Sequence, residues 1–397
     1  MIVGEHVGSP LRRQCRGEPA CSPRLNYCER HQSAKLKMYT FAKLLSEHQR
    51  NNNSTYEQLA SDVGVKRQTI MRWKTGESLP SKREHILKLA NALRLKPRRR
   101  DELLYAAQKK PENPDFKSPP LPPKPLSNEP LIIPVIARPI HHPRQFFGRY
   151  AQLNRIFQAW NQSILQHLAV TGPKRCGKTS LLNYVKSIHY LEQSVLRDGQ
   201  RQDWLEPLFD WVLIDFDDVR THKPDSFLRL ILETLNIPAP DEHHDFAKLT
   251  EIFENNLDRA TVLLIDQIEK GLQLPALDQP FWGNLRYLGN HCNGKLGFCV
   301  TSRQSIDKLI KTAHQLGKPS PFFNIFGQIE LGPLTEQEAR ELLQYVSLSQ
   351  DDAEWILEKS HYWPVLLQVL CQIRLDSEND WKKVGLETIE KDYKYLL

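Results

Sequence analysis

One nine-residue stretch constrains the fold of this chain more than any other. Gly172-Pro-Lys-Arg-Cys-Gly-Lys-Thr-Ser180 sets two glycines five residues apart, with Lys178 and Thr179 directly after the second. That spacing lets successive backbone N–H groups turn inward toward a phosphate, and the following helix adds its positive N-terminus. The apolar run Leu168 to Val170 favours a strand before the loop, and the spacing from Leu181 to Val185 favours a helix after it. The stretch therefore predicts a nucleotide site in an α/β domain.

The loop residues have separable expected tasks. Lys178 would meet the β- and γ-phosphates as a point charge, and the Thr179 hydroxyl would ligate Mg²⁺. Cys176, near a helix N-terminus, is either a redox-sensitive thiol with a lowered pKa or a neutral loop residue. The other candidate phosphate-binding residues are Gly172, Pro173, Lys174, Arg175, Gly177 and Ser180.

Composition excludes several classes of protein. No apolar run approaches the ~18 residues needed to cross a bilayer, and the N-terminus does not resemble a signal peptide. Seven scattered cysteines form no evident disulfide framework, so a reducing cytoplasm fits best and no membrane partner is expected. A chain of 397 residues is long enough for two domains.

Charge is divided unevenly along the chain. Residues 1–110 carry 23 Lys and Arg against 10 Asp and Glu, a net +13, whereas the whole chain is +7 and the remainder therefore −6. A basic N-terminal part on an acidic body favours a polyanionic partner for that part. A solvated basic surface gives the same count and is the alternative.

We expect residues 1–37 to be a disordered lead, because they show no periodicity. Only Cys28-x-x-His31 has chelate-like spacing there, and zinc sites usually show two close pairs. Met38 stands directly before the first periodic segment, so the folded protein is expected to begin there.

Apolar periodicity over residues 38–108 predicts five short helices. Capping boxes at Ser54–Glu57 and Ser81–Glu84 would open the second and fourth. Gly64 would make a turn before the third, Lys66–Trp73, and the fifth would begin near Pro97.

The second and third helices, joined through Gly64, have the order of a helix-turn-helix. The spacing of Leu59-Ala60, Gly64-Val65, Ile70, Trp73 and Gly76…Pro80 resembles the Cro/lambda-repressor-like (XRE-type) DNA-binding domain. The resemblance implies that the third helix enters the major groove of double-stranded DNA. The alternative is a helical bundle that binds protein, since the same family includes protein-contacting members.

That resemblance assigns roles to the third helix. Arg67, Gln68 and Arg72 fall where base-reading side chains project, and Arg suits guanine as Gln suits adenine. Thr69 and Lys74 are better placed for phosphate, and Lys66 completes the expected DNA-contacting set. Ile70 and Trp73 are expected in the core.

Residues 109–143 contain eleven prolines and are expected to be a linker. Such a run favours extended polyproline conformation, so we expect a semi-rigid spacer that lets two domains reorient.

From residue 144 onward, strands alternate with helices. An amphipathic helix with Leu153, Ile156, Phe157 and Trp160 precedes the phosphate loop, and Asp266 ends the most apolar of the later strands. The alternation predicts a parallel sheet with its ligand at the carboxyl ends of the strands. Predicted strands are Leu168–Val170, Trp211–Asp215, Thr261–Asp266 and Leu296–Val300; predicted helices are Phe227–Leu235 and Phe246–Leu257.

Several motifs together resemble the STAND branch of the AAA+-related P-loop ATPases. They are Phe147-Gly-Arg149, the phosphate loop, Leu264-Ile-Asp-Gln-Ile-Glu269 and Thr301-Ser-Arg303, with Leu331–Arg340 similar to the start of the helical lid and Trp363–Gln368 to its nucleotide-covering segment. The resemblance implies ATP as the nucleotide, with Gly148 and Arg149 near the adenine and Pro364 closing over it. Two positions depart from the pattern: Tyr150 replaces a common acid, and His361-Tyr362 replace small residues.

The resemblance also suggests how hydrolysis would run. Asp266 would hold Mg²⁺, often through water. Many related ATPases place Glu at the next position, but this chain has Gln267, which can orient water and cannot act as a general base. Glu269 could supply the carboxylate, and Arg303 is either a γ-phosphate sensor or a surface residue. We therefore expect slow hydrolysis, suited to a switch.

The predicted architecture is multidomain. An all-α helix-turn-helix domain (residues 38–108) and a linker (109–143) precede an α/β P-loop NTPase core with a parallel sheet (144–330) and a helical lid (331–397). The leading function is an ATP-dependent DNA-binding switch regulating transcription, with ATP, Mg²⁺, double-stranded DNA, further copies of the chain and a protein sensor or effector as partners. The alternatives are a DNA-associated ATPase that recruits transposition or replication factors, and a STAND-type defence or signalling scaffold whose N-terminal bundle binds protein.

Overall fold

The computed structural model describes residues 41–397, except 51, 115, 117–133, 137, 192, 206–208, 239–245, 258 and 378. The expected lead, residues 1–37, and most of the expected linker therefore lie outside the described residues. Residue contacts divide the chain into two compact units, Met1–Glu112 and Asn113–Leu397.

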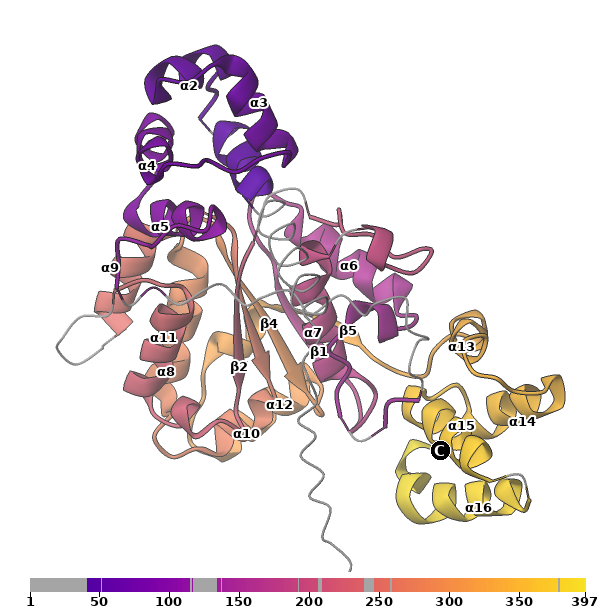
Figure 1. Ribbon diagram of the computed structural model, residues 1–397. Helices are drawn as coiled ribbons and strands as arrows, with labels where there is room; N and C mark the ends of the chain where they lie inside the picture. The colour runs from indigo at the N-terminus through magenta and orange to yellow at the C-terminus, as the bar shows by residue number, and fades with distance from the viewer. Residues whose placement is uncertain are drawn as a thin grey trace, which may run out of the picture. The chain divides into compact units, whose positions relative to one another are not determined.

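The first unit is built from short helices. Residues 41–50 form a helix, and α2 (Tyr56–Val63), α3 (Arg67–Thr75), α4 (Arg83–Ala92) and α5 (Pro97–Ala106) follow (Figure 1). Gly64 ends α2 with φ 78, a left-handed conformation that glycine adopts without strain, so the predicted turn is present. Ile70 and Trp73 are buried as predicted.

Neither predicted capping box is present as predicted: the first lies one residue further along the chain, and at the second no side chain caps the helix. Thr55, not Ser54, caps α2, and it forms the reciprocal box with Gln58. The Ser54 hydroxyl instead donates to the Asn52 carbonyl at 3.5 Å. At α4 the capping position is Lys82, whose side chain makes no capping bond, because the helix begins two residues after Ser81.

The second unit contains a five-stranded, fully parallel sheet with strand order β2-β3-β4-β1-β5. The strands are β1 (His167–Thr171), β2 (Asp210–Asp215), β3 (Thr261–Asp266), β4 (Leu296–Ser302) and β5 (Phe326–Glu330). Four were predicted. The fifth was missed because β5 is an edge strand in which only Ile329 is buried, so it has no apolar run in its sequence.

Helices cover both faces of this sheet (Figure 1). Along β3, Val262 and Leu264 pack into one apolar cluster and Leu263 and Ile265 into the other, as expected from the period-2 alternation of a strand. Every residue of β3 is buried, which explains why its sequence is an unbroken apolar run.

The helices divide between the two layers by the cluster that they join. The first layer is α6 (Tyr150–Trp160) and α7 (Lys178–Ser187). The second layer is α8 (Pro224–Thr234), α9 (Phe246–Asn256), α10 (Ile268–Gln273), α11 (Gln279–His291) and α12 (Ile306–Gln315). The predicted helices correspond to α6, α8 and α9, together with the helix after the phosphate loop, α7.

The C-terminal part is helical, as predicted for a lid. It comprises α13 (Glu336–Leu343), α14 (Gln350–Ser360), α15 (Pro364–Asp376) and α16 (Trp381–Thr388), followed by a short π-helical segment, Ile389–Tyr393. No helix in the described part of the chain combines the length and apolarity needed to cross a bilayer.

Gly271 in α10 is a position where the packing of the second unit can be tested. A Cβ atom there would lie 2.5 Å from the Phe216 ring, so Gly271→Ala should lower the unfolding free energy by about 1–3 kcal/mol through overpacking. Gly283→Ala in α11 is the matched control, because a Cβ there meets nothing within 4 Å. It should be neutral or stabilise by up to about 1 kcal/mol.

Tryptophan fluorescence during denaturation measures this difference, since seven of the eight tryptophans belong to the second unit. Equal unfolding midpoints for the two variants would contradict the contact between α10 and Phe216.

Candidate functional site

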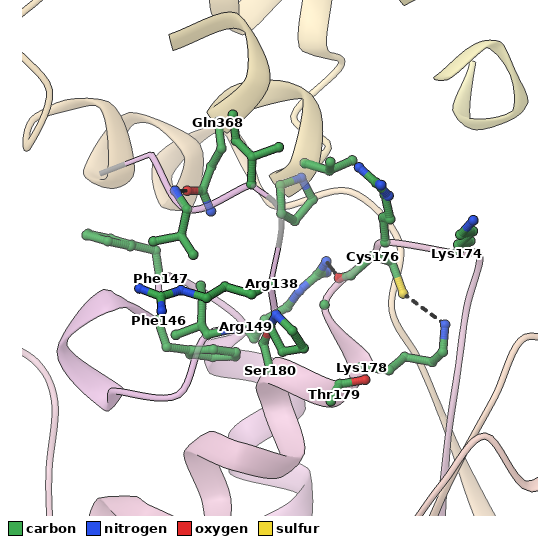
Figure 2. A pocket seen from close by; sticks show the side chains of 18 of the residues that line it. Arg138, Phe146, Phe147, Arg149, Lys174, Cys176, Lys178, Thr179, Ser180 and Gln368 are labelled. Carbon is green, nitrogen blue, oxygen red and sulfur yellow. Dashed lines mark hydrogen bonds between the residues drawn. The ribbon is translucent and has the colours of Figure 1, made fainter. Parts of the chain in front are cut away.

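A cavity of about 310 Å³ lies at the carboxyl ends of the strands (Figure 2). Its walls come from four sources: the phosphate loop, the segment before α6, the lid, and the ends of β3 and β4 with the start of α10. The predicted residues that line it are Arg149, Lys174, Arg175, Cys176, Gly177, Lys178, Thr179, Ser180, Asp266, Gln267, Glu269, Arg303 and Pro364. Gly148, Gly172 and Pro173 were predicted as binding residues but are not among the lining residues.

The two loop glycines are required by backbone geometry. Gly172 has φ 153 and Gly177 has φ 100, in the region that favours glycine. A Cβ on Gly172 would lie 2.5 Å from the Leu331 carbonyl oxygen, so the start of the lid runs directly against the loop. Arg175 also has positive φ, 65, which completes the tight curl.

Lys178 lies at the mouth of the loop. Its ammonium donates to the carbonyls of Gly172 and Pro173, at 2.8 Å each. A phosphate oxygen is a stronger acceptor for an ammonium than a backbone carbonyl, because the bond is then charged on both sides. Lys178 is therefore positioned to exchange these carbonyls for an anion.

Asp266 is the centre of the polar network. The carboxylate is buried, with 2% exposure, and Thr179 donates to its Oδ2 at 2.7 Å. The Thr301 hydroxyl donates to Oδ1, and the Gln267 N–H donates in turn to Thr301 Oγ1 at 3.0 Å. Thr301 belonged to a predicted motif but had no predicted role.

The adjacent hydroxyl and carboxylate fit Mg²⁺, which prefers oxygen ligands and usually takes few from protein when phosphates supply others. In the described residues, no three His, Cys, Asp or Glu side chains converge on a metal site of their own. Thr179 and Asp266 would hold Mg²⁺ only together with a bound phosphate group. The ion would then draw negative charge away from that phosphate.

Gln267 is held by two acids that were not predicted as site residues. It opens α10 with φ 59, and its Nε2 donates to Asp215 Oδ1 at 3.1 Å and to Asp217 Oδ2 at 2.7 Å. Hydrogen bonds from Lys270 and Gln267 lower the pKa of Asp217. Asp215 ends β2 in register with Asp266, so its place at a strand end was the available sequence signal.

Glu269 and Arg303 form a pair beside the cavity. Glu269 Oε1 accepts the Arg303 N–H at 3.3 Å, and the Arg303 Nε lies 3.8 Å from the same oxygen. Glu269 Oε2 is buried and has no hydrogen-bond donor in the described structure. This carboxylate oxygen is unpaired but shielded from solvent, so it accepts a hydrogen bond only when a ligand or water reaches it from the cavity.

Arg149 joins the loop to the lid. Its buried guanidinium donates to the carbonyls of Gly332 at 2.7 Å, Cys176 at 3.0 Å and Pro333 at 3.2 Å. Burial lowers the pKa of Arg149. Gly148 serves the same junction, because a Cβ there would lie 2.8 Å from the Glu338 side chain of α13. These residues therefore set the position of the lid.

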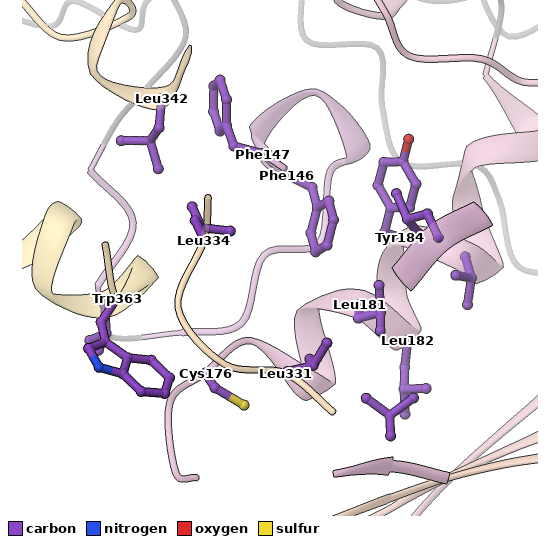
Figure 3. Close-up of a cluster of buried hydrophobic side chains, with 14 of the residues drawn as sticks. Phe146, Phe147, Cys176, Leu181, Leu182, Tyr184, Leu331, Leu334, Leu342 and Trp363 are labelled. Atoms are coloured by element: carbon purple, nitrogen blue, oxygen red, sulfur yellow. The ribbon is translucent and has the colours of Figure 1, made fainter. Parts of the chain in front are cut away.

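An apolar cluster supports the same junction (Figure 3). Phe146 and Phe147 come from the segment before α6, Leu181 from α7, and Leu334 and Leu342 from the lid region. The lid thus packs on the loop helix through burial as well as through hydrogen bonds.

Cys176 is fully buried in the loop. Burial raises the pKa of its thiol, although the charges of Lys178 and Arg149 oppose the shift. Burial thus favours the neutral loop residue over a thiol with a lowered pKa.

The outer side of the loop contacts the end of the chain. Arg175 donates to the Tyr393 hydroxyl at 2.8 Å, and its guanidinium lies 5.6 Å from the centre of the Tyr393 ring. The Tyr395 hydroxyl donates to the Lys174 carbonyl at 3.5 Å. The side chain of Arg175 therefore contacts the lid and also lines the cavity.

In the first unit, α3 presents the predicted DNA-contacting residues. Lys66, Arg67, Gln68 and Arg72 are exposed, and Thr69 and Lys74 are partly buried. Three have partners within the unit: Arg67 pairs with Glu57 at 2.6 Å, Arg72 lies 3.9 Å from Glu77, and the Lys74 ammonium contacts Tyr56. The two ion pairs are exposed, and such pairs are worth about 0–1 kcal/mol, so a DNA phosphate could replace them.

No protein family and no curated protein matches the sequence. Solved structures do resemble it. The Walker-type ATPase PABY2304 of Pyrococcus abyssi is 15% identical, with a TM-score of 0.45 over 64% of this chain and 75% of that chain. Drosophila ORC bound to DNA is 10% identical, with a TM-score of 0.41 over 63% of each chain. A RuvB variant of Thermotoga maritima is 17% identical, with a TM-score of 0.36 over 62% and 70%. At such values these similarities do not assign a function to this chain.

The network around Asp266 can be tested at Thr301. Thr301→Val keeps the shape but removes the hydroxyl, leaving the Gln267 N–H without its acceptor and Asp266 with one donor fewer. The unfolding free energy should fall by about 1–3 kcal/mol, the cost of unpaired buried polar groups. Thr301→Ser keeps the hydroxyl and should restore most of that loss. Equal denaturation midpoints for the two variants would show that the hydroxyl bonds contribute nothing.

Proposed function

We propose that this protein is an ATP-dependent DNA-binding switch that regulates transcription. The carrying observation is the convergence on one cavity of a loop lysine, a magnesium-type hydroxyl and carboxylate pair, and a second carboxylate with a free oxygen, Glu269. The same chain carries a basic helical unit with exposed cationic side chains on α3.

Nucleotide binding would use the loop directly. Lys178 would exchange its two carbonyl partners for phosphate oxygens, and the backbone from Gly172 to Gly177 would direct N–H groups at the same phosphates. Thr179 and Asp266 would hold Mg²⁺ against them. The lid residues Pro364 and Val365 would cover the base, and ATP is the proposed nucleotide.

Hydrolysis is proposed to be slow. Gln267 is tethered to Asp215 and Asp217, so its amide is fixed and has no basic atom to accept a proton. Glu269 has the free carboxylate oxygen, and it would take a proton from the attacking water. Its other oxygen is held by Arg303, which would link the state of the γ-phosphate to the orientation of this base.

DNA binding would use the exposed face of α3. Arg67, Gln68 and Arg72 would contact base edges, while Lys66, Thr69 and Lys74 would contact phosphate. Assembly into homo-oligomers, or contact with a protein sensor, would then be the property that the nucleotide changes.

Removing the loop ammonium should separate the two activities. Lys178→Ala removes the two charged hydrogen bonds available to phosphate, worth about 1.5–3 kcal/mol each, so nucleotide affinity should fall by about two to four orders of magnitude. Lys308→Ala, which removes the same charge from exposed α12, is the matched control. DNA binding is measured at fixed salt with no nucleotide, ATP and ADP.

Wild type should bind DNA with different affinity or stoichiometry in ATP and ADP, and Lys178→Ala should bind it equally in all three conditions. Equal binding by wild type would overturn the switch. Turnover strongly stimulated by DNA would instead favour an ATPase that recruits other factors to DNA.

Base reading by α3 is tested at Arg72. Arg72→Ala should cost about 1–3 kcal/mol at one base position and relax the preference there, whereas Lys74→Ala should weaken binding to all sequences alike. Arg94→Ala, an exposed position outside α3, is the charge control. Selection from a random DNA pool, before and after substitution, measures the preference. An unchanged selected sequence for Arg72→Ala would remove this side chain from base reading.

A further inference from the structure

One wall of the nucleotide cavity is made by residues that were predicted to be spacer. Residues 134–136 and 138–142, here called the strap, lie at the end of the proline-rich segment and are part of the second unit. Five of them line the cavity: Val135, Ile136, Arg138, Pro139 and Ile140. Figure 2 shows Arg138 on this wall, with Gln368 reaching in from the lid.

The strap is tied to the lid at one end. The Val135 N–H donates to Gln368 Oε1 of α15. Gln368 is 7% exposed and lies four residues after Pro364, so this bond connects the strap to the helix that covers the cavity.

At its other end the strap is tied to the helix of the phosphate loop. The Ile140 N–H donates to Ser180 Oγ at 3.0 Å, and Asn183 Nδ2 donates to the Ile140 carbonyl at 3.0 Å. Ser180 directly follows Thr179 in the chain, so this end of the strap bonds to the neighbour of a residue of the magnesium-type pair. It therefore spans the cavity from the lid to the loop.

These contacts would give the strap a role in nucleotide binding, which a free spacer would not have. A nucleotide in the cavity would touch the strap, the lid and the loop together, and would hold all three in one arrangement. The strap is also the stretch of chain through which the second unit continues toward the first. The strap is therefore the part of the connection between the units that a bound nucleotide would contact.

We infer that the strap is a nucleotide-sensing wall of the site, and that bound ATP holds it in this arrangement, bonded to the lid and to α7, and thereby acts on the DNA-binding unit. This inference rests on the proposed function. Because coupling is reciprocal, DNA that favours this arrangement of the strap must raise nucleotide affinity by the same factor.

Amide hydrogen exchange of the full-length protein tests the inference directly. Exchange in the peptide covering residues 134–142 is compared with no nucleotide, with Mg-ADP and with Mg-ATP. Mg-ATP should slow the exchange of the Val135 and Ile140 amides about fivefold, the effect of one net hydrogen bond.

Two substitutions weaken the ties separately. Gln368→Leu removes the acceptor on the lid. Asn183→Leu removes one of the two bonds to α7 and leaves the bond from the Ile140 N–H to Ser180. Each should lower the ATP-induced protection and reduce the difference in DNA affinity between ATP and ADP. Gln372→Leu is the matched control: Gln372 lies one turn further along α15, its side chain donates to Asp376 at 2.6 Å, and it is not among the residues that line the cavity.

The outcomes separate this inference from the proposed function. If wild type binds ATP and its DNA affinity responds, yet exchange of the strap is unchanged, the inference is wrong and the switch stands. If both tie variants keep the full ATP–ADP difference, the inference is likewise wrong. If wild type binds no ATP at all in a titration, the proposed function fails and the inference fails with it.

Discussion

The buried carboxylate of Asp266 is the interaction on which the rest of the site depends. A carboxylate with 2% exposure costs several kcal/mol unless donors replace its water. Here the donors are two hydroxyls, Thr179 from the loop helix and Thr301 from β4. Because β4 lies between β1 and β3, the acid and the loop can meet only across the end of β4. Hydrogen bonds therefore join the phosphate loop, the end of β4 and Asp266. The Thr179 hydroxyl that donates to Asp266 is also a suitable ligand for a magnesium ion.

A second requirement is that the lid start against the loop. Leu331 runs so close to Gly172 that a Cβ atom would not fit, and both terminal nitrogens of Arg149 donate to carbonyls of the loop and of residues 332–333. A buried arginine with three carbonyl acceptors is a rigid joint, since losing one acceptor leaves a charged donor unpaired. The lid is thus anchored at its first residues, and movement during a nucleotide cycle would have to arise further along it.

Sequence reasoning succeeded where the physics is local. The glycine spacing of the loop follows from backbone conformation at Gly172 and Gly177, and β3 is recognisable because both its faces are buried. It did not find contacts between residues that lie far apart in the sequence. Nothing in the sequence around Asp215 and Asp217 says that they would hold the Gln267 amide, because the partners lie about fifty residues apart. The edge strand β5 was missed for a different reason: most of its residues are exposed, so its sequence contains no apolar run.

The strap is a second case in which the sequence did not reveal contacts between distant residues. Proline content predicts a spacer over residues 109–143, because proline fixes an extended backbone whether or not that backbone is packed. Composition therefore cannot distinguish a free spacer from one whose end is bound. The distinction lies in the non-proline amides: Val135 and Ile140 each have an N–H to donate, and each donates it to a side chain that lines the cavity. The two amides therefore make the end of the proline-rich segment part of the wall of the cavity.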